Sequence, residues 1–273
     1  MTASESHELN WFAVSSDRTR IQRAGFKTAG GGTHQSKTLM LAELTAYMQA
    51  ALHSEASASD LIIEQNVLGK ATLSARKIAL TRLTGLYAVS ERASIASVLF
   101  AIWPLDHHGR PLLALLAALA RDPLLRESAA AVLPSSLGAS VRWPDIAAKF
   151  EAQFPDRFSP SMLKSLSQNC ASSWSQSGHL RGHIKKVRNQ AKPTPAVAAY
   201  AALLATVCGF GGPTLLESPW MDVLDLPPGE RLSLLRQAEA QGLVRLRTAG
   251  DMLEIVVRQP MAQTLRMPDL AEL

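Results

Sequence analysis

Hydrophobic residues recur at helical spacing along most of the chain, and the stretch from Ser159 to Asn189 shows this pattern most clearly. Its apolar positions are three or four residues apart, which predicts a helix with one buried face. Ser159 suits the N-cap, Pro160 suits the first turn, and Gly178 suits the left-handed position after the last turn. We therefore expect a helix between Ser159 and Gly178 whose buried stripe consists of Leu163, Leu166, Cys170 and Trp174.

The residues on either side of this helix extend the pattern into a DNA-binding motif. Pro144 to Phe154 has apolar residues in i, i+4 register, so a second helix should meet the first across the turn Pro155 to Phe158. Two helices joined in this way are typical of a helix-turn-helix. Leu180 to Val187, with a glycine and a basic cluster, predicts a hairpin that would form the wing of a winged helix and lie along phosphates.

The N-terminal half also has helical periodicity. Residues 1 to 36 have no clear periodicity, with Trp11 and Phe12 as a possible anchor and a flexible glycine turn at Gly30 to Gly32. Three short helices then form a second helix-turn-helix-like unit, although a generic three-helix bundle has the same pattern. Its last helix has Thr72 as N-cap and a predicted apolar face of Leu73, Leu80, Leu83 and Tyr87. The helices expected in this half span residues 38–52, 59–66, 72–88, 90–103, 110–121 and 123–133.

The C-terminal part predicts a helix at 196–208, a helix at 228–241 that ends at Gly242, and two strands at 243–247 and 252–257 around a turn at Ala249 to Asp251. A helix followed by a hairpin is again of winged-helix type. Abundant alanine and leucine with few aromatic residues favour packing of helices on helices. We therefore expect a mainly α fold with small β-hairpin wings and a hinge at residues 134–140. The expected units are residues 1–135, a winged helix-turn-helix at 136–192 and, after a linker at 189–195, a C-terminal unit at 193–273.

Charge is distributed unevenly, although the net charge is only +5. Three segments, Arg18 to Ala42, Gln65 to Ser90 and Arg157 to Leu216, contain basic residues and no acidic ones. Such sorting favours a polyanionic partner, most commonly nucleic acid, if the basic residues share a face. The alternative is an ordinary solvated basic surface.

The predicted helical phase and the basic clusters together select the candidate contacts to nucleic acid. The helix at 159–178 offers a short polar face, the wing offers a basic cluster, and the N-terminal unit offers a basic helix with a lysine just before the first helix. These candidates are Lys164, Gln168, Ser172, Lys185, Lys186, Arg188, Arg76, Lys77 and Lys37.

Other chemistry is poorly supported. Gly31 to Thr38 matches a phosphate-binding P-loop except that Ser36 replaces the second glycine, and no buried strand leads into it. His179 and His183 have the spacing of zinc ligands, but the glycines beside them break the helix and a third ligand is missing. No nucleophile with a recognisable base is found. We expect no enzyme activity, no metal and no cofactor.

The sequence also bears on compartment. Two cysteines, Cys170 and Cys208, are too few for a disulfide framework, and we expect both to be reduced core residues. Met1 to Asn10 is polar and acidic, without an apolar signal region. The longest apolar run, Pro111 to Ala120, is too short for a bilayer that needs about 20 residues. A cytoplasmic protein without membrane contact is the expectation.

The order of these features resembles the BrxA family of the BREX bacteriophage-exclusion systems. The residues that carry the resemblance lie between about 26 and 185, and the C-terminal part lies largely beyond them. They are Thr28 to Gly31, Glu43, Asn66 to Leu68, Thr72, Ser74, Arg76, Arg82, Leu83, Phe158 to Pro160, Leu163, Lys164, Asn169, Ser172, Ser173 and Gly178 to Leu180.

The resemblance implies a non-enzymatic, mostly helical protein of a phage-defence system, associated with binding of double-stranded DNA and likened to NusB-type RNA-binding proteins. We therefore expect an accessory protein that binds duplex DNA mainly through phosphates, with other BREX proteins as partners. Two alternatives stay open, namely RNA binding by a NusB-like bundle and a structural adaptor within the defence complex.

Overall fold

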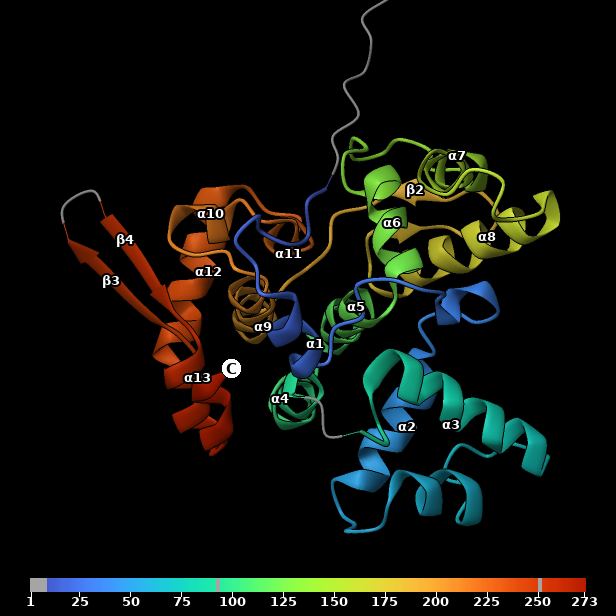
Figure 1. The fold of residues 1–273 in the computed structure, drawn as a ribbon, viewed down its shortest axis with the longest axis horizontal. Coiled ribbons are helices and arrows are strands. Elements are labelled where there is room, and N and C mark those ends of the chain that lie inside the picture. The colour runs from blue at the N-terminus through green and yellow to red at the C-terminus, as the bar shows by residue number, and fades with distance from the viewer. Residues whose placement is uncertain (1–8, 92–93, 250–251) are drawn as a thin grey trace, which may run out of the picture.

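The computed structural model describes residues 9–91, 94–249 and 252–273. Helices dominate, and the strands form two small antiparallel pairs (Figure 1), so the expectation of a mainly α fold with small hairpins is confirmed. The α-helices are α1 (Arg18–Ala24), α2 (Leu41–Ala51), α3 (Leu73–Tyr87), α4 (Ser94–Ile102), α5 (Arg110–Arg121), α6 (Pro123–Val132), α7 (Trp143–Gln153), α8 (Pro160–Gln176), α9 (Pro195–Val207), α10 (Pro213–Leu216), α11 (Pro219–Asp222), α12 (Pro228–Ala240) and α13 (Arg258–Thr264). The shorter helical turns are η1 (Thr33–Gln35), η2 (Asp60–Glu64) and η3 (Pro268–Glu272), and the strands are β1 (Leu180–Arg181), β2 (Val187–Arg188), β3 (Arg245–Ala249) and β4 (Met252–Val256).

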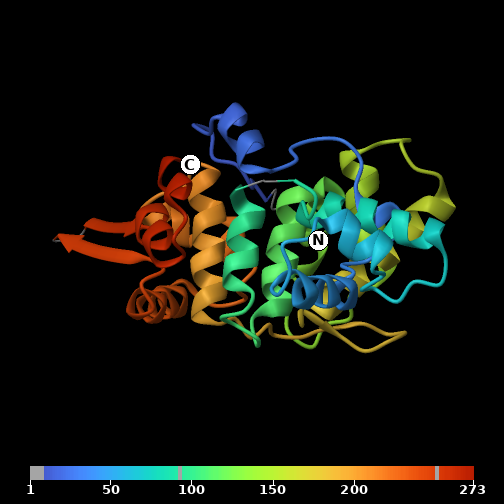
Figure 2. The same cartoon turned by 90° about the horizontal axis from the view of Figure 1, so that it is seen from below.

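Three helices, α9, α4 and α5, lie side by side in the centre of the molecule (Figure 2). Every residue of α5 from Leu112 to Arg121 is buried, as its apolar character on all sides predicts. The alanine-rich α9 is buried over most of its length, because small side chains let neighbouring helices approach closely. The other elements pack around this central layer.

The predicted anchor near the N-terminus is present. Trp11 is buried, its ring meets that of Trp220 edge-on at 4.8 Å, and the Trp220 indole N–H donates to the Trp11 carbonyl at 2.8 Å. Beyond it the chain forms α1, where we expected no regular element. Asp17 caps this helix by accepting from the backbone N–H groups of Thr19 and Arg20, and Gly25 ends it in the left-handed conformation.

The helices α6, α7 and α8, followed by the β1–β2 hairpin, have the order of elements of a winged helix. The segment expected to be a hinge, residues 134–140, contributes a third strand position, since Ser140 pairs with Val187 on the outer side of β2. Because α6 packs against both α7 and α8, the first helix of this unit lies before the predicted boundary at residue 135. The buried residues form one continuous core from Trp11 to Leu270, which runs through all three predicted units.

At the other end of the molecule, α12 leads into the β3–β4 hairpin, which projects away from the body (Figure 1). Its register pairs Arg245 with Val256 and Ala249 with Met252. Of the predicted turn at residues 249–251, Gly250 and Asp251 lie outside the described residues. The short elements α10, α11, α13 and η3 had no clear signal in the sequence.

Most predicted helices are present with ends shifted by a few residues. The first, expected from residue 38, begins at Leu41, and the one expected at 59–66 is the single π-helical turn η2. On α3 the predicted apolar face is only partly correct. Leu83 and Tyr87 are fully buried, but Leu73 is 53% exposed because it lies in the first turn, which projects beyond the core.

Trp174 gives a direct test of the phase of α8. All four residues of its predicted stripe are buried, and the Trp174 indole N–H donates to Ser128 Oγ at 2.8 Å. Trp174→Ala should therefore lower the free energy of unfolding by about 3 to 5 kcal/mol, measured by chemical denaturation. The matched control is Trp143→Ala, because Trp143 is 38% exposed and should contribute less than about 1 kcal/mol. Equal losses for both variants would contradict this packing.

Candidate nucleic-acid interface

The N-terminal half of α8 presents the polar face that the sequence predicts. Ser159 Oγ accepts the backbone N–H of Met162, so the helix begins at the expected residue. Lys164 and Gln168 are exposed one turn apart, whereas Ser172, one turn further, is half-buried. The Lys164 ammonium lies 5.8 Å from the centre of the Trp143 ring on α7, within the range of a cation–π contact. This contact holds the lysine beside the exposed end of the helix.

The β1–β2 wing adds a second basic element next to α8. Lys185 is exposed in the loop between the strands, and its ammonium has no hydrogen-bond or ion-pair partner among the described residues. Lys186 is half-buried and donates to Ser175 Oγ on α8 at 2.8 Å, and burial lowers the pKa of its ammonium. The wing is thus fastened to α8, with Lys185 directed to solvent.

The N-terminal candidates differ in their surroundings. Lys77 on α3 and Lys37, which follows η1, are exposed. Arg76 is half-buried, and its guanidinium donates to the Ile63 carbonyl at 2.9 Å and to the Lys70 carbonyl at 3.4 Å. It therefore fixes the start of α3 to η2. Lys37 closely follows η1, which contacts both α3 and α8.

The prediction that Arg188 faces nucleic acid is wrong. Its side chain is only 2% exposed, and its guanidinium forms a two-pronged ion pair with Asp225, with bonds of 2.6 and 3.0 Å. The same group donates to the carbonyls of Val132 and His179 at 3.0 and 3.2 Å. Because β2 alternates, Arg188 points inward, where it joins the wing to the turn after α11.

His179 completes this junction. Its Nδ1 accepts from the Ser177 hydroxyl at 2.9 Å, and its Nε2–H donates to the Val223 carbonyl at 2.9 Å. Burial, together with the charge of Arg188, lowers the pKa of the imidazole to about 4, although the bond to Val223 and the charge of Asp225 act in the opposite direction. The ring is therefore neutral near pH 7, and its two bonds fix the proton on Nε2.

A buried chain of Ser173, His34 and Asp122 has the connectivity of a hydrolase triad, and sequence reasoning missed it. His34 Nδ1 lies 2.8 Å from Asp122 Oδ2, and His34 Nε2 lies 2.8 Å from Ser173 Oγ. None of the three residues is more than 1% exposed, and Ser173 Oγ also contacts the Asn169 carbonyl within its own helix. A substrate cannot approach this hydroxyl, so the chain serves to dock η1 onto α8.

The charge state of Asp122 fits this role. Burial alone raises the pKa of its carboxyl, but the charge of His34 and hydrogen bonds from His34 and Leu125 outweigh burial, so the pKa lies below its usual range. Gly32 allows the close approach, because a Cβ there would lie 1.8 Å from Asp122 Oδ1. In the glycine turn expected to be flexible, the last glycine is therefore required because a side chain there would clash with Asp122.

A second polar stripe on α8 could have revealed this contact. Asn169, Ser173 and Gln176 follow i, i+4, i+7 spacing and all bond to the N-terminal segment. Asn169 donates to the His34 carbonyl at 2.9 Å, and Gln176 donates to Thr38 Oγ1 at 3.1 Å. This second polar face of α8 therefore has its partners inside the protein.

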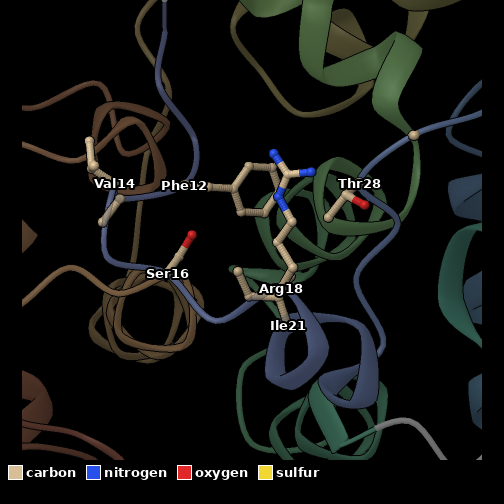
Figure 3. A pocket seen from close by; sticks show the side chains of 8 residues that line it. Phe12, Val14, Ser16, Arg18, Ile21 and Thr28 are labelled. Carbon is tan, nitrogen blue, oxygen red and sulfur yellow. The ribbon is translucent and has the colours of Figure 1, made fainter.

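A cavity of about 360 Å³ lies beside the segment that leads into α1. The Phe12 ring and the Arg18 side chain extend into it, and the hydroxyls of Ser16 and Thr28 line it (Figure 3). Its lining supplies one guanidinium and two hydroxyls but no carboxylate, imidazole or thiol, so these residues provide no acid–base pair.

The described residues contain no group of three or more metal-ligating side chains, and none of their helices is long and apolar enough to cross a membrane. Both cysteines are buried and unpaired, as expected. Comparison with protein-family models and with curated proteins gives no match to this chain.

The low pKa of His179 predicts a pH-dependent stability. The folded-state value of about 4 lies below the value of about 6.5 expected when unfolded, so protonation favours unfolding as the pH falls through this window. The free energy of unfolding should fall by about 2 to 3 kcal/mol between pH 7 and pH 4 through this residue. His179→Gln, which can keep the bond to Val223, should remove this part of the decline. Identical denaturation curves against pH for both proteins would contradict the assignment.

Proposed function

We propose that this protein is a non-enzymatic, cytoplasmic DNA-binding protein that contacts duplex DNA mainly through phosphates. The observation that carries the proposal is the placement of exposed basic groups on the winged-helix unit. Lys164 and Gln168 lie on α8 and Lys185 lies on the adjacent wing, and all three side chains reach solvent. A polar helix face beside a basic hairpin matches the two surfaces of a duplex, its groove and its phosphate backbone.

The charge around this unit supports a polyanion. The segment Arg157 to Leu216 contains no acidic residue. Of the acids on the neighbouring α7, Asp145 pairs with Arg142 at 3.1 Å, which reduces its repulsion of phosphate. Glu151 and Asp156, near the turn between α7 and α8, are exposed and weaken the basic field there. We therefore assign the main phosphate contacts to the wing and to Lys164, away from that turn.

The chemistry of the exposed groups favours backbone contacts over base reading. Lysine is a point charge that suits phosphate, whereas base-specific pairs usually need the fork of arginine or the amide of asparagine or glutamine. On the exposed half of α8, Gln168 is the residue suited to a base edge. We infer binding with modest sequence preference. With the resemblance to the BrxA family, this supports an accessory role in a BREX-type defence complex.

Lys185→Glu provides the main test. It should weaken binding to duplexes of any sequence and reduce the slope of log K against log salt by about one unit, because it removes one phosphate contact. The matched control is Arg236→Glu, an exposed residue without a partner among the described residues, on α12, the helix that packs against β3. Affinities are measured for the full chain at several salt concentrations by fluorescence anisotropy.

Competition distinguishes the proposal from its alternatives. Unlabelled duplex DNA should displace the labelled duplex, and structured RNA at the same concentration should not. Preferential displacement by RNA would favour a NusB-like RNA-binding protein instead. Weak binding of both ligands at physiological salt would favour a structural adaptor, and an unchanged slope for Lys185→Glu would remove the assigned contact.

The N-terminal unit provides a second expected contact to the same duplex. Lys77 on α3 is exposed, and η1 packs against both α3 and α8. When combined with Lys185→Glu, Lys77→Glu should therefore reduce the slope of log K against log salt by about one further unit. This further reduction should be seen only with a duplex long enough to reach both the wing and α3. If Lys77→Glu changes neither affinity nor slope while Lys185→Glu does, the N-terminal unit does not contact DNA.

A further inference from the structure

We propose that Ile184, at the tip of the β1–β2 wing, inserts into the minor groove of duplex DNA as an apolar wedge that kinks the duplex. This inference rests on the proposed function and deepens it, because it specifies how the wing engages its ligand. Three features of the wing carry it: the exposure of its tip, the tight turn and anchored base of its loop, and the charge around it.

The tip of the wing is an isoleucine that the fold leaves in solvent. Ile184 is 92% exposed, although a side chain of this size gains free energy from burial. Single exposed hydrophobic residues are common on protein surfaces, so exposure alone carries no function. At this position, however, the side chain projects from a hairpin that already lies next to the predicted groove-binding helix.

The loop that presents Ile184 turns tightly at Gly182 and is anchored at its base. Gly182 has a φ of +94°, and a Cβ at this position would lie 2.2 Å from the Lys185 carbonyl oxygen, so the turn closes more tightly than another residue allows. Below the loop, the Val141 N–H donates to the Lys186 carbonyl at 3.0 Å, and the Lys186 ammonium is bound to α8. A preorganised tip loses little conformational entropy on insertion.

The charge around the tip matches the edges of a minor groove. Arg181, the last residue of β1, precedes Ile184 and Lys185 follows it in the loop; both are exposed, and His183 beside it is exposed as well. Architectural DNA-binding proteins insert an isoleucine, leucine or phenylalanine between base pairs while basic side chains bind the flanking phosphates. An apolar tip between two cations suits this arrangement better than an apolar groove of a protein, which would leave both charges to be desolvated.

The test compares Ile184→Ala with Lys185→Ala in the full chain, using a short duplex with a central TA step and a dye at each end. The intact protein should bind this duplex and raise energy transfer between the dyes, because a kink shortens the end-to-end distance. Ile184→Ala should lose about tenfold in affinity and most of the change in energy transfer, with an unchanged salt slope. Ile184→Leu should restore both.

The control should behave in the opposite way. Lys185→Ala should reduce the salt slope and still raise energy transfer on saturation, because it removes a phosphate contact and keeps the wedge. Ile184→Ala should melt like the intact protein, since its side chain makes few contacts in the folded chain.

The outcomes separate the two proposals. If Ile184→Ala binds and bends the duplex like the intact protein while Lys185→Ala still lowers the slope, the wedge is overturned and phosphate binding stands. If the intact protein binds without any change in energy transfer, the wedge is likewise overturned. If the intact protein does not bind duplex DNA at all, both proposals fail, and a protein partner becomes the ligand to seek for the wing.

Discussion

The fold depends on one buried carboxylate, that of Asp122 at the corner between α5 and α6. It caps α6 by accepting the N–H groups of Leu124 and Leu125, and it binds both the backbone and the ring of His34. Such a charge is stable inside a protein only when all its partners are present, and loss of one partner typically costs about 3 to 5 kcal/mol. The position of η1, and with it the approach of the N-terminal unit to α8, therefore follows from this corner.

Two arginines extend the same junction. Arg121 donates to the carbonyls of Gly25, Thr84 and Gly85, which lie at the ends of α1 and α3. Arg126 donates to the carbonyls of Leu119 and Lys27, and burial lowers the pKa of its guanidinium to about 10. Carbonyls in the last turn of a helix often lack a partner within the helix, and these guanidinium groups supply hydrogen-bond donors there where water is excluded. Segments far apart in the sequence thereby converge on the central layer.

The sequence predicts the local elements well, because caps and periodicity act over a few residues. The N-cap at Ser159 and the buried stripe of α8 are both present as expected. Prediction from the sequence fails where a side chain has a partner far away in the chain. Arg188 is buried and not exposed because it pairs with Asp225, which lies 37 residues away in the sequence. His34 is docked by Asp122 and Ser173, which lie 88 and 139 residues away. The polar stripe on α8 indicates that a second face of this helix has a partner, but no local pattern identifies His34 as that partner or distinguishes Arg188 from a solvated arginine. The exposed candidates on α8 and the wing were therefore predictable, and the buried pairs were not.

The segment expected to be a linker is packed against the protein, beside the pair of Arg188 and Asp225. Residues 189–194 are held along their length, since Asp225 accepts the Ala191 N–H at 2.9 Å and Asn189 donates to the Gly178 carbonyl at 2.8 Å. The two hairpins, which lie on opposite sides of the central helices (Figure 1), are therefore joined through packed structure and not through a tether. A displacement of the wing would therefore have to disturb the Arg188–Asp225 pair and the packing of the central helices before it reached the β3–β4 hairpin.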